Sequence, residues 1–346
     1  MNTAPETHQI TPSRIMETAL AFFASKTLLS AVKLNVFTVL SGKSLSGKEI
    51  QAALKLHDRG VYDFLDALVA LGFLNREGFL ETARYSNTPE TGIFLDKHKP
   101  SYMGGFVEMA NDRLYPFWGS LEEALLTGQP QNEIKHNGKP LFEELYAKPE
   151  RLKQFIDAMS GISIGNFMAL ARKFDFSPYS TLCDIGGAAG ILSVEVAKQH
   201  PNMSCISADL PTVEPIANEY IASKGMSDRV KTKNVDFFTD EFPQADVITM
   251  GMILHDWDLP NKKMLIRKAY NALPEGGAFI AIEALIDDDR RKNAFGLLMS
   301  LNMLIEFGVA FDFTGADFER WTKEAGFRRV EVIPLAGPSS AAIAYK

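Results

Sequence analysis

Acidic and glycine residues gather in the middle of the chain in an order that suits a ligand with a cationic end. Asp184 comes just before a turn that contains Gly186, Gly187 and Gly190. Glycines there let the backbone approach a ligand, and the helix that follows offers free N–H groups. The turn lacks the Gly-x-Gly-x-x-Gly spacing of dinucleotide sites, and the Asp184 carboxylate would repel a pyrophosphate. The same carboxylate suits an amino acid ammonium or a sulfonium.

Two more acidic positions follow, each at the end of an expected strand. Asp209 lies 19 residues after Gly190, where a carboxylate can accept both hydroxyls of a ribose. Asp236 can accept from an exocyclic amine, and Phe237 beside it can cover a purine face. This order of residues predicts S-adenosylmethionine as the ligand. The competing interpretations are structural: tight turns for the glycines, a helix cap for Asp209 and a turn residue for Asp236.

Alternating strands and helices must position these side chains. The expected strands cover 181–185, 204–208, 230–234, 247–250 and 279–283, and the expected helices cover 191–199, 213–224 and 262–273. This alternation predicts an α/β fold with a parallel, doubly wound sheet, completed by short strands near 330–334 and 341–345. Ligands of such sheets bind outside the carboxyl ends of the strands, which is where the acids and glycines lie.

The N-terminal part has a different pattern, in which helices lead into a hairpin. Helices are expected over 15–40, 46–54 and 59–71, the second with a capping-box pattern at its start, and residues 73–80 are expected to form a small β-hairpin. This order predicts a winged-helix unit. The apolar residues of 15–40 exceed what a small domain needs, which favours a dimer contact.

Composition and charge narrow the class of protein. The 346 residues are 46% hydrophobic and 23% charged, with a net charge of −7, which is typical of a globular protein. The negative net charge disfavours binding to anionic membranes. Together with Asp63 and Asp66 on the helix expected over 59–71, the candidate recognition helix of the winged-helix unit, it also disfavours binding to nucleic acid. Cys183 and Cys205 are too few for a disulfide framework or a zinc ligand set. We expect no signal peptide and no membrane span, since polar residues interrupt the apolar stretch 295–311, and hence a cytoplasmic protein.

The chain carries, at 250–258, a Met-Gly-Met-Ile-Leu-His-Asp-Trp-Asp sequence that resembles the His-Asp-Trp signature of the S-adenosylmethionine-dependent O-methyltransferases of the caffeate and acetylserotonin type. The similarity continues in 272–277 and 317–327. It implies three parts: a winged-helix dimerisation domain over 1–105, a helical linker over 106–175 that contributes to the acceptor pocket, and a Rossmann-like catalytic domain over 176–346. It also implies a homodimer in which each N-terminal domain helps to close its partner's pocket, and a metal-free transfer that releases S-adenosylhomocysteine.

The resemblance also implies roles for individual residues. His255 is expected to be the general base, flanked and oriented by Glu283 and Asp312. Asp312 is shorter than the glutamate common at its position, so the sequence leaves open whether its carboxylate reaches His255. The residues expected to bind the cofactor are Asp184, Gly186, Gly187, Gly190, Asp209, Leu210, Asp236, Phe237 and Met250. The residues expected to line the acceptor pocket are Phe106, Met109, Arg113, Tyr115, Trp118, Phe155, Met159, Met299, Asn302 and Met303.

The methylated atom stays open at this stage. O-methylation of a phenol or enol is favoured, because a histidine with a pKa of about 6.5 can remove a hydroxyl proton at neutral pH. Methionine and aromatic residues in the expected pocket also suit a soft acceptor. A second hypothesis is therefore S-methylation of a thioether or thiol acid, with His255 positioning the substrate, and N-methylation is a further possibility. A third hypothesis is a winged-helix regulator that senses S-adenosylmethionine.

Overall fold

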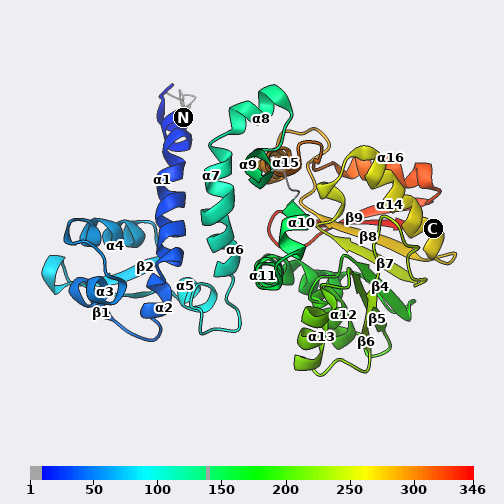
Figure 1. Ribbon diagram of the computed structural model, residues 1–346, viewed down its shortest axis with the longest axis horizontal. Helices are drawn as coiled ribbons and strands as arrows, with labels where there is room; N and C mark the ends of the chain where they lie inside the picture. The colour runs from blue at the N-terminus through cyan, green and yellow to red at the C-terminus, as the bar shows by residue number, and fades with distance from the viewer. Residues whose placement is uncertain (1–9, 138–140) are drawn as a thin grey trace, which may run out of the picture. The chain divides into compact units, whose positions relative to one another are not determined.

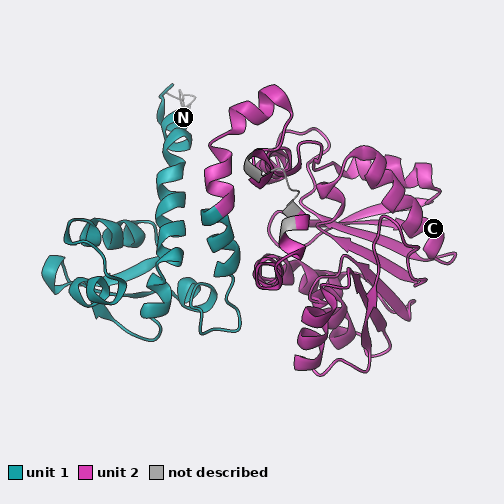
Figure 2. Ribbon diagram, viewed as in Figure 1, with its two compact units in different colours: residues 1–112 teal, residues 113–346 magenta. Residues whose placement is uncertain are grey.

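The computed structural model describes residues 10–137 and 141–346 (Figure 1). The chain folds into two compact units, one ending at Asp112 and one running from Arg113 to Lys346 (Figure 2). We call them the N-terminal unit and the C-terminal unit. The division falls inside the expected linker 106–175, whose first residues group with the N-terminal unit and whose remainder groups with the C-terminal unit.

The N-terminal unit combines helices with a small sheet of order β1-β3-β2. Its elements are α1 (Ser13–Lys33), α2 (Val36–Val39), β1 (Leu45–Ser46), α3 (Gly47–Leu54), η1 (Asp58–Gly60), α4 (Val61–Ala70), β2 (Leu74–Glu77), η2 (Leu80–Thr82), β3 (Arg84–Asn87), α5 (Pro89–Phe94) and α6 (Gly104–Met109), and the π-helical turn η3 (Ala110–Leu114) crosses into the next unit. The expected capping box starts α3, where the Ser46 hydroxyl accepts from the Glu49 N–H and the Ser46 N–H donates to the Glu49 carboxylate. Phe37, Leu65 and Tyr85 lie in its core.

Two expected elements of this unit differ from the structure. The helix expected over 15–40 ends at Lys33, because Asn35 adopts a left-handed backbone conformation (φ 62°) and a separate helix, α2, follows. The hairpin is formed by β2 and β3, so its second strand does not include residues 79–80. Those residues belong to the connection, where the Thr82 hydroxyl hydrogen-bonds back to Phe79 and closes the turn η2 before the chain returns.

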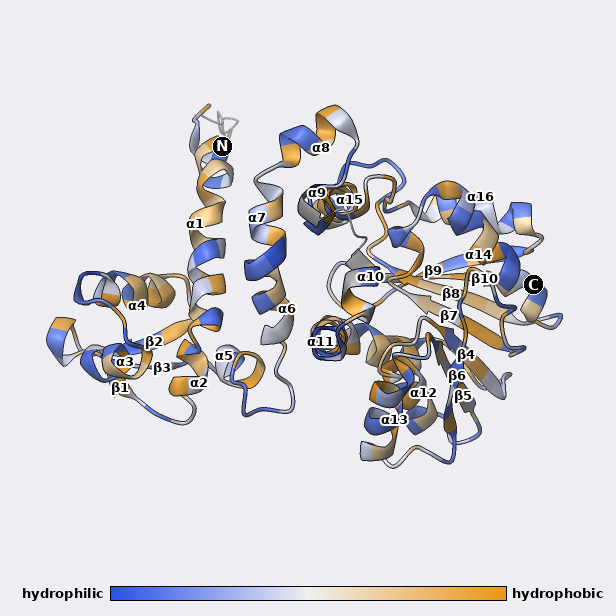
Figure 3. Cartoon of the chain, in the orientation of Figure 1, coloured by the Kyte–Doolittle hydropathy of each residue, from blue (hydrophilic) through white to orange (hydrophobic). Residues whose placement is uncertain are grey.

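Helix α1, whose ribbon is coloured as apolar along much of its length in Figure 3, exposes several apolar side chains, which we call the α1 apolar surface. It consists of Ile15, Met16, Leu20, Phe22 and Phe23, all of which are exposed. By length and composition alone, α1 is also apolar enough to cross a membrane, whereas the apolar helix α15 (Ala294–Phe307) is shorter. Exposed apolar side chains gathered in this way mark an interaction surface.

The C-terminal unit is built around a seven-stranded sheet of order β6-β5-β4-β7-β8-β10-β9. Its helices are α7 (Tyr115–Trp118), α8 (Leu121–Thr127), α9 (Glu133–Asn137), α10 (Leu141–Tyr146), α11 (Pro149–Lys173), α12 (Ile191–Gln199), α13 (Glu214–Ser223), η4 (Leu254–Asp256), α14 (Leu259–Ala272), α15 and α16 (Gly315–Ala325). Its strands are β4 (Thr181–Ile185), β5 (Ser204–Asp209), β6 (Val230–Asn234), β7 (Val247–Gly251), β8 (Ala278–Glu283), β9 (Arg329–Pro334) and β10 (Ser340–Tyr345). The first five strands are parallel, as predicted, and β10 runs antiparallel to both β8 and β9.

Alternate residues of the strands face two different layers of helices (Figure 1). In β8, Phe279 and Ala281 pack with side chains of α14 and α16, while Ile280 and Ile282 pack with side chains of α11, α12 and α13. Because helices cover both faces, the central strands β4, β7, β8 and β10 are largely buried and apolar, and the turns after the carboxyl ends of the parallel strands share one edge of the sheet. The candidate site lies on these turns.

Candidate active site

The turn between β4 and α12 requires glycine at two positions. A Cβ atom at Gly186 would lie 2.5 Å from the Ile253 side chain, and one at Gly187 would lie 2.3 Å from the Ser207 hydroxyl. Ala188 follows with a positive φ of 47°, a conformation that costs an ordinary residue roughly 1–2 kcal/mol. The turn is therefore tightly packed, and a side chain at either glycine would collide with Ile253 or Ser207.

Asp209, at the end of β5, holds this turn in place. One carboxylate oxygen accepts from the Ala188 N–H at 2.9 Å, and the other accepts from the Leu210 N–H at 2.7 Å. Burial raises the pKa of Asp209, and the two N–H donors oppose that rise. Because a carboxylate has about four lone-pair positions, Asp209 can still accept the two hydroxyls of a ribose.

Asp184 lies beneath the same turn, inside β4. Its side chain is buried, and one oxygen accepts from the Thr249 hydroxyl at 2.7 Å. Its other oxygen would lie 3.2 Å from a Cβ at Gly187. Burial raises the pKa of Asp184 to about 7, although the Thr249 hydrogen bond opposes the rise. A cationic ligand above the turn would stabilise this buried carboxylate.

Asp236 and Phe237 follow β6 in a loop that other residues hold in shape. One Asp236 oxygen accepts from the Phe238 N–H at 2.9 Å, so this acid does serve its own turn. The Lys268 ammonium on α14 donates to the carbonyl groups of Phe237, Phe238 and Asp240. The Phe237 ring packs beside Trp257, with 5.9 Å between ring centroids. Met250, in β7, is fully buried.

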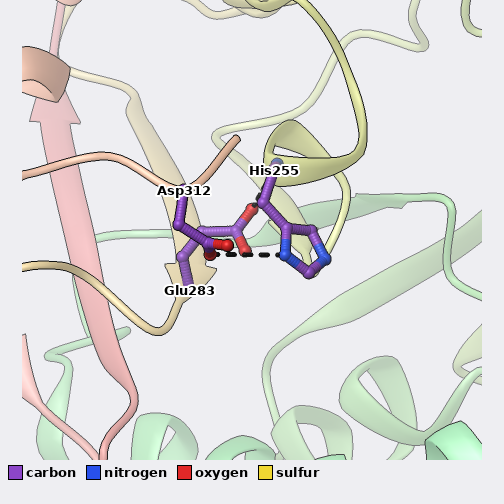
Figure 4. A group of neighbouring side chains, drawn as sticks. All are labelled: His255, Glu283 and Asp312. Carbon is purple, nitrogen blue, oxygen red and sulfur yellow. Dashed lines mark hydrogen bonds and ion pairs between the residues drawn. The ribbon is translucent and has the colours of Figure 1, made fainter. Parts of the chain in front are cut away.

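His255 lies between two carboxylates in the turn η4, which follows β7. Its Nδ1 atom lies 3.3 Å from an Asp312 oxygen, and its Nε2 atom lies 3.3 Å from an Asp256 oxygen. Glu283 does not pair with the ring; it accepts from the backbone N–H groups of Leu254 and His255 at 3.0 and 3.4 Å. Figure 4 shows Asp312 and Glu283 on one side of the ring and Nε2 turned away from both. Although it is short, the Asp312 side chain reaches His255.

The carboxylates around His255 favour its protonated form. Burial alone would lower the pKa of His255, but the charges of Glu283, Asp256 and Asp312 raise it to about 10. Burial raises the pKa of Asp256 to about 6 and that of Glu283 to about 7, and the His255 charge opposes both rises. The site therefore stabilises an imidazolium, the form that results when His255 takes up a proton.

The same three side chains could in principle hold a metal ion, because donor atoms of His255, Glu283 and Asp312 lie within 4.8 Å of one another. Two features of the site favour the acid–base interpretation. Glu283 is already engaged by two backbone N–H groups. The ammonium of Lys262, on α14, also interacts with the charges of Glu283, Asp312 and Asp256, so a cation already faces these carboxylates.

Polar residues of the expected acceptor pocket pair with one another. Trp118 Nε1 donates to the Asn302 side-chain oxygen at 2.9 Å. The Arg113 guanidinium donates to both oxygens of Glu133, at 2.6 and 2.8 Å, and to Glu306 at 3.0 Å. These acids use three of the five N–H donors of the guanidinium, and the part of Arg113 in binding an acceptor stays a prediction.

Aromatic side chains connect the expected pocket with the His255 turn. The Phe142 ring packs against Phe155, Trp257 and Phe307, with centroids 6.3, 6.3 and 5.7 Å away. Tyr146 stacks on Phe142, and the charges of Asp209 and Asp256 add to the burial that raises its pKa. Tyr146 is therefore close enough to both Asp209 and Asp256 for their charges to act on it.

The remaining expected pocket residues are spread over several elements. Phe106 and Met109 lie on α6 of the N-terminal unit, where both are half-buried. Tyr115 lies on α7, Met159 on α11, and Met299 and Met303 on α15, where Met303 is buried. Their part in binding an acceptor stays a prediction.

Sequence reasoning missed the partners that only the folded chain brings together. In the sequence, Lys262 and Lys263 look like two adjacent surface lysines. In the structure, Lys262 shares the buried face of α14 with Leu265, Ile266 and Ala269. That helical spacing was the available signal. Phe142 and Glu133 lie on short helices that are distant from α15 in the sequence. No local residue pattern predicts their contacts.

Comparison with protein families gives two matches that together cover most of the chain. Residues 118–328 match an O-methyltransferase domain. Residues 16–97 match an O-methyltransferase dimerisation domain, and this match includes most of the α1 apolar surface.

Individual proteins show the same similarity over nearly their full length. The chain is 40% identical to the tetracenomycin polyketide synthesis 8-O-methyl transferase TcmO of Streptomyces glaucescens, over 99% of each chain. It is 32% identical to the 3-hydroxy-5-methyl-1-naphthoate 3-O-methyltransferase of Streptomyces sahachiroi, over 95% of this chain and 93% of the other. The crystal structure of human N-acetylserotonin methyltransferase in complex with SAM superposes with a TM-score of 0.89 at 27% identity, covering 98% of this chain and 99% of that one.

Proposed function

Because the chain belongs to the S-adenosylmethionine-dependent O-methyltransferases that carry a dimerisation domain, we propose that it methylates a phenolic or enolic hydroxyl of a small molecule with His255 as the general base. The observation that carries this proposal is the pairing of the buried His255 ring with Asp312 on one side and Asp256 on the other. The names of two relatives, an 8-O-methyl transferase of polyketide synthesis and a hydroxynaphthoate 3-O-methyltransferase, favour an acceptor with fused aromatic rings.

The residues after β4, β5 and β6 fit the cofactor. The backbone at Gly187 lies directly against the buried Asp184 carboxylate, and Asp209, which accepts from the Ala188 N–H of the same turn, can accept the ribose hydroxyls. Phe237 is placed to cover the purine, and Asp236 to accept from its amine. When bound, S-adenosylmethionine supplies an electrophilic methyl group on a sulfonium sulfur, which keeps the electron pair of the broken bond.

His255 manages the proton of the acceptor. Asp312 fixes the ring through Nδ1, so Nε2 is the atom that takes the hydroxyl proton as the acceptor oxygen forms its bond to the methyl carbon. Asp256 lies beside Nε2 and has a more exposed side chain than Asp312, so the acceptor approaches from the Asp256 side. The three carboxylates then stabilise the imidazolium until the proton passes to solvent. The aromatic cluster around Phe142 helps to keep water from the reacting atoms.

A labelling experiment tests the proposal. The purified protein is incubated with methyl-labelled S-adenosylmethionine and three separate acceptor pools: hydroxylated naphthoates and related phenols, thioether and thiol acids, and amines. Label in an aryl methyl ether supports the proposal. Label only in a thioether or an amine product would overturn the choice of a hydroxyl acceptor.

Chelators should leave methyl transfer unchanged, because the proposed chemistry uses His255 and its carboxylates without a metal ion. The measurement is the rate with methyl-labelled cofactor after dialysis against EDTA and a second chelator, with and without added Mg²⁺ or Zn²⁺. A rate that falls on chelation and returns with one of these ions would show that His255, Glu283 and Asp312 hold a metal instead.

We also propose that the protein is a homodimer formed through its N-terminal unit. The dimerisation-domain match and the α1 apolar surface support this assembly. In a symmetric dimer each substitution occurs twice in the interface, so Phe22→Asp combined with Phe23→Asp should weaken self-association at least about 100-fold, because unpaired carboxylates would be buried.

Sedimentation velocity over a range of concentrations measures this effect. Ala52→Asp, an exposed position on α3, is the matched control and should sediment like the unmodified protein. Equal sedimentation of all three proteins as dimers would show that the α1 apolar surface is not the contact.

A further inference from the structure

Lys262 is a buried cation that the mechanism above does not use. It lies on α14, and its side chain is inaccessible to solvent. Its neighbour Lys263 behaves in the ordinary way, since it is 40% exposed and pairs with Glu324 at 2.6 Å. Lysine is almost never fully buried unless its charge is paired, so the buried position calls for a specific role.

The contacts of Lys262 join the two chain segments that hold the base and its partner. Its ammonium donates to the carbonyl oxygen of Trp257, which ends the turn that carries His255. The same ammonium lies 3.7 Å from the centroid of the Phe311 ring, a cation–π contact. Phe311 directly precedes Asp312. One side chain thus contacts both chain segments that carry the pair formed by His255 and Asp312.

The acids that face Lys262 largely coincide with those that face His255. Lys262 interacts with Glu283 of β8, Asp312, Asp256 of η4 and Asp258 at the start of α14. His255 interacts with Glu283, Asp256 and Asp312. Glu306 of α15 acts on Asp256, and its own carboxylate pairs with Arg113 at 3.0 Å.

The balance of charges around His255 determines how strongly the imidazole binds its proton. The carboxylates that act on His255 outweigh its single positive charge, and the ammonium of Lys262 offsets part of that excess. A neutral histidine is the form that can act as a base, and each unbalanced negative charge nearby disfavours that form. Burial pulls the pKa of Lys262 down to about 8, against the four acids, so the ammonium is still the main form at neutral pH.

We propose that Lys262 is a positioning residue for methyl transfer, whose ammonium offsets the acids that keep His255 protonated and whose contacts join the His255 turn to the Asp312 segment. This inference rests on the proposed role of His255 as the base. The side chain of Lys262 does not itself touch the acceptor; it acts through the histidine and its partner.

The test compares Lys262→Met, which removes the charge, with Lys262→Arg, which keeps it. The readout is the pH profile of kcat/KM between pH 6 and 10. Lys262→Met should lower kcat/KM on the ascending limb about tenfold between pH 6 and 7, and this deficit should shrink above about pH 8, where Lys262 of the unmodified protein loses its own charge. Lys262→Arg should keep the limb at or below its original position. Lys263→Met, on the exposed side of the same helix, is the matched control and should leave the profile unchanged.

A double variant separates charge from structure. Adding Asp256→Asn to Lys262→Met removes one acid along with the cation and should return the limb toward its original position. If Lys262→Met does not fold, Lys262→Gln replaces it, since the amide keeps a donor for the Trp257 carbonyl without the charge. A uniform loss of activity at every pH, with the limb unmoved, would overturn the proposal and leave Lys262 a structural residue.

The outcome is distinguishable from failure of the proposed function itself. If His255→Ala retains the ascending limb, His255 is not the base, and the premise fails. If His255→Ala abolishes the limb while both charge-removing variants of Lys262 leave it in place, only the role of Lys262 is wrong. Calorimetry with S-adenosylhomocysteine should give affinities within about twofold for all folded Lys262 variants, because no Lys262 contact reaches the glycine turn.

Discussion

Replacing His255 with alanine should lower kcat/KM for methyl transfer by about 10²–10⁴-fold, because the acceptor hydroxyl loses its general base. The loss should fall on the chemical step and not on cofactor binding. The glycine turn is held by Asp209 through the Ala188 N–H, and His255 takes no part in that contact. Single-turnover rates with preloaded S-adenosylmethionine, together with calorimetry of S-adenosylhomocysteine, separate the two effects.

The pH profile gives this prediction a second readout. Because the surrounding acids raise the pKa of His255 to about 10, the neutral imidazole becomes available only as pH rises toward that value. Activity of the unmodified protein should therefore climb from neutral to alkaline pH, well above the ordinary histidine value of about 6.5. The climb should vanish in His255→Ala.

A surface histidine supplies the control. His98 has a side chain that is 69% exposed, and His98→Ala should match the unmodified protein in rate and pH profile. Near-normal activity of His255→Ala at every pH would refute the base assignment, as would an ascending limb of the unmodified protein that lies near the ordinary histidine value.

Asp209→Ala should weaken binding of S-adenosylhomocysteine by about 10–100-fold. The change removes the proposed ribose acceptor and also frees the N–H groups of Ala188 and Leu210. Hydrogen bonds to a charged group contribute about 1.5–3 kcal/mol each, which corresponds to about 10–100-fold in affinity for one such bond. Without the hydrogen bond from its N–H to Asp209, Ala188 is held less firmly in the left-handed conformation that shapes the turn.

Calorimetry measures the loss of affinity directly, and two further variants serve as comparisons. Asp209→Asn keeps one oxygen acceptor and should lose less affinity than Asp209→Ala. Asp228→Ala, at an exposed acid before β6, should bind like the unmodified protein. Unchanged affinity in Asp209→Ala would mean that Asp209 only shapes the turn and does not contact the ribose.

The C-terminal unit was largely predictable because its central strands are buried on both faces. Residues such as Phe279 to Ile282 are apolar without interruption, and segments with helical spacing separate these runs. The glycine turn was readable for a similar reason, since Gly186 and Gly187 stand where only glycine fits. The direction of β10 was not predictable, because the same apolar run can pair in either sense and the short connection from β9 decides it.

The sequence did not predict features that depend on the backbone conformation of one residue or on contacts between residues distant in the chain. The left-handed Asn35 ends α1 early, although apolar spacing continues beyond it. Whether Asp312 reaches His255 depends on how Phe311 and its loop sit against α14, and Lys262 takes part in that packing. Charge pairing of this kind is a property of the folded site, so local residue patterns do not predict it.

The insertion of β10 between β8 and β9 has a consequence for synthesis of the chain. Residues 340–345 pair with both neighbours along their full length, and the Lys346 ammonium donates to the carbonyl groups of Tyr270 and Leu273. Because residues 340–345 follow the other strands of this sheet in the chain, β8 gains its second partner only after they have been synthesised and have left the ribosome. Until then the apolar β8 presents an open edge that can recruit other strands. Slow translation of the segment between β8 and β10 should therefore favour aggregation.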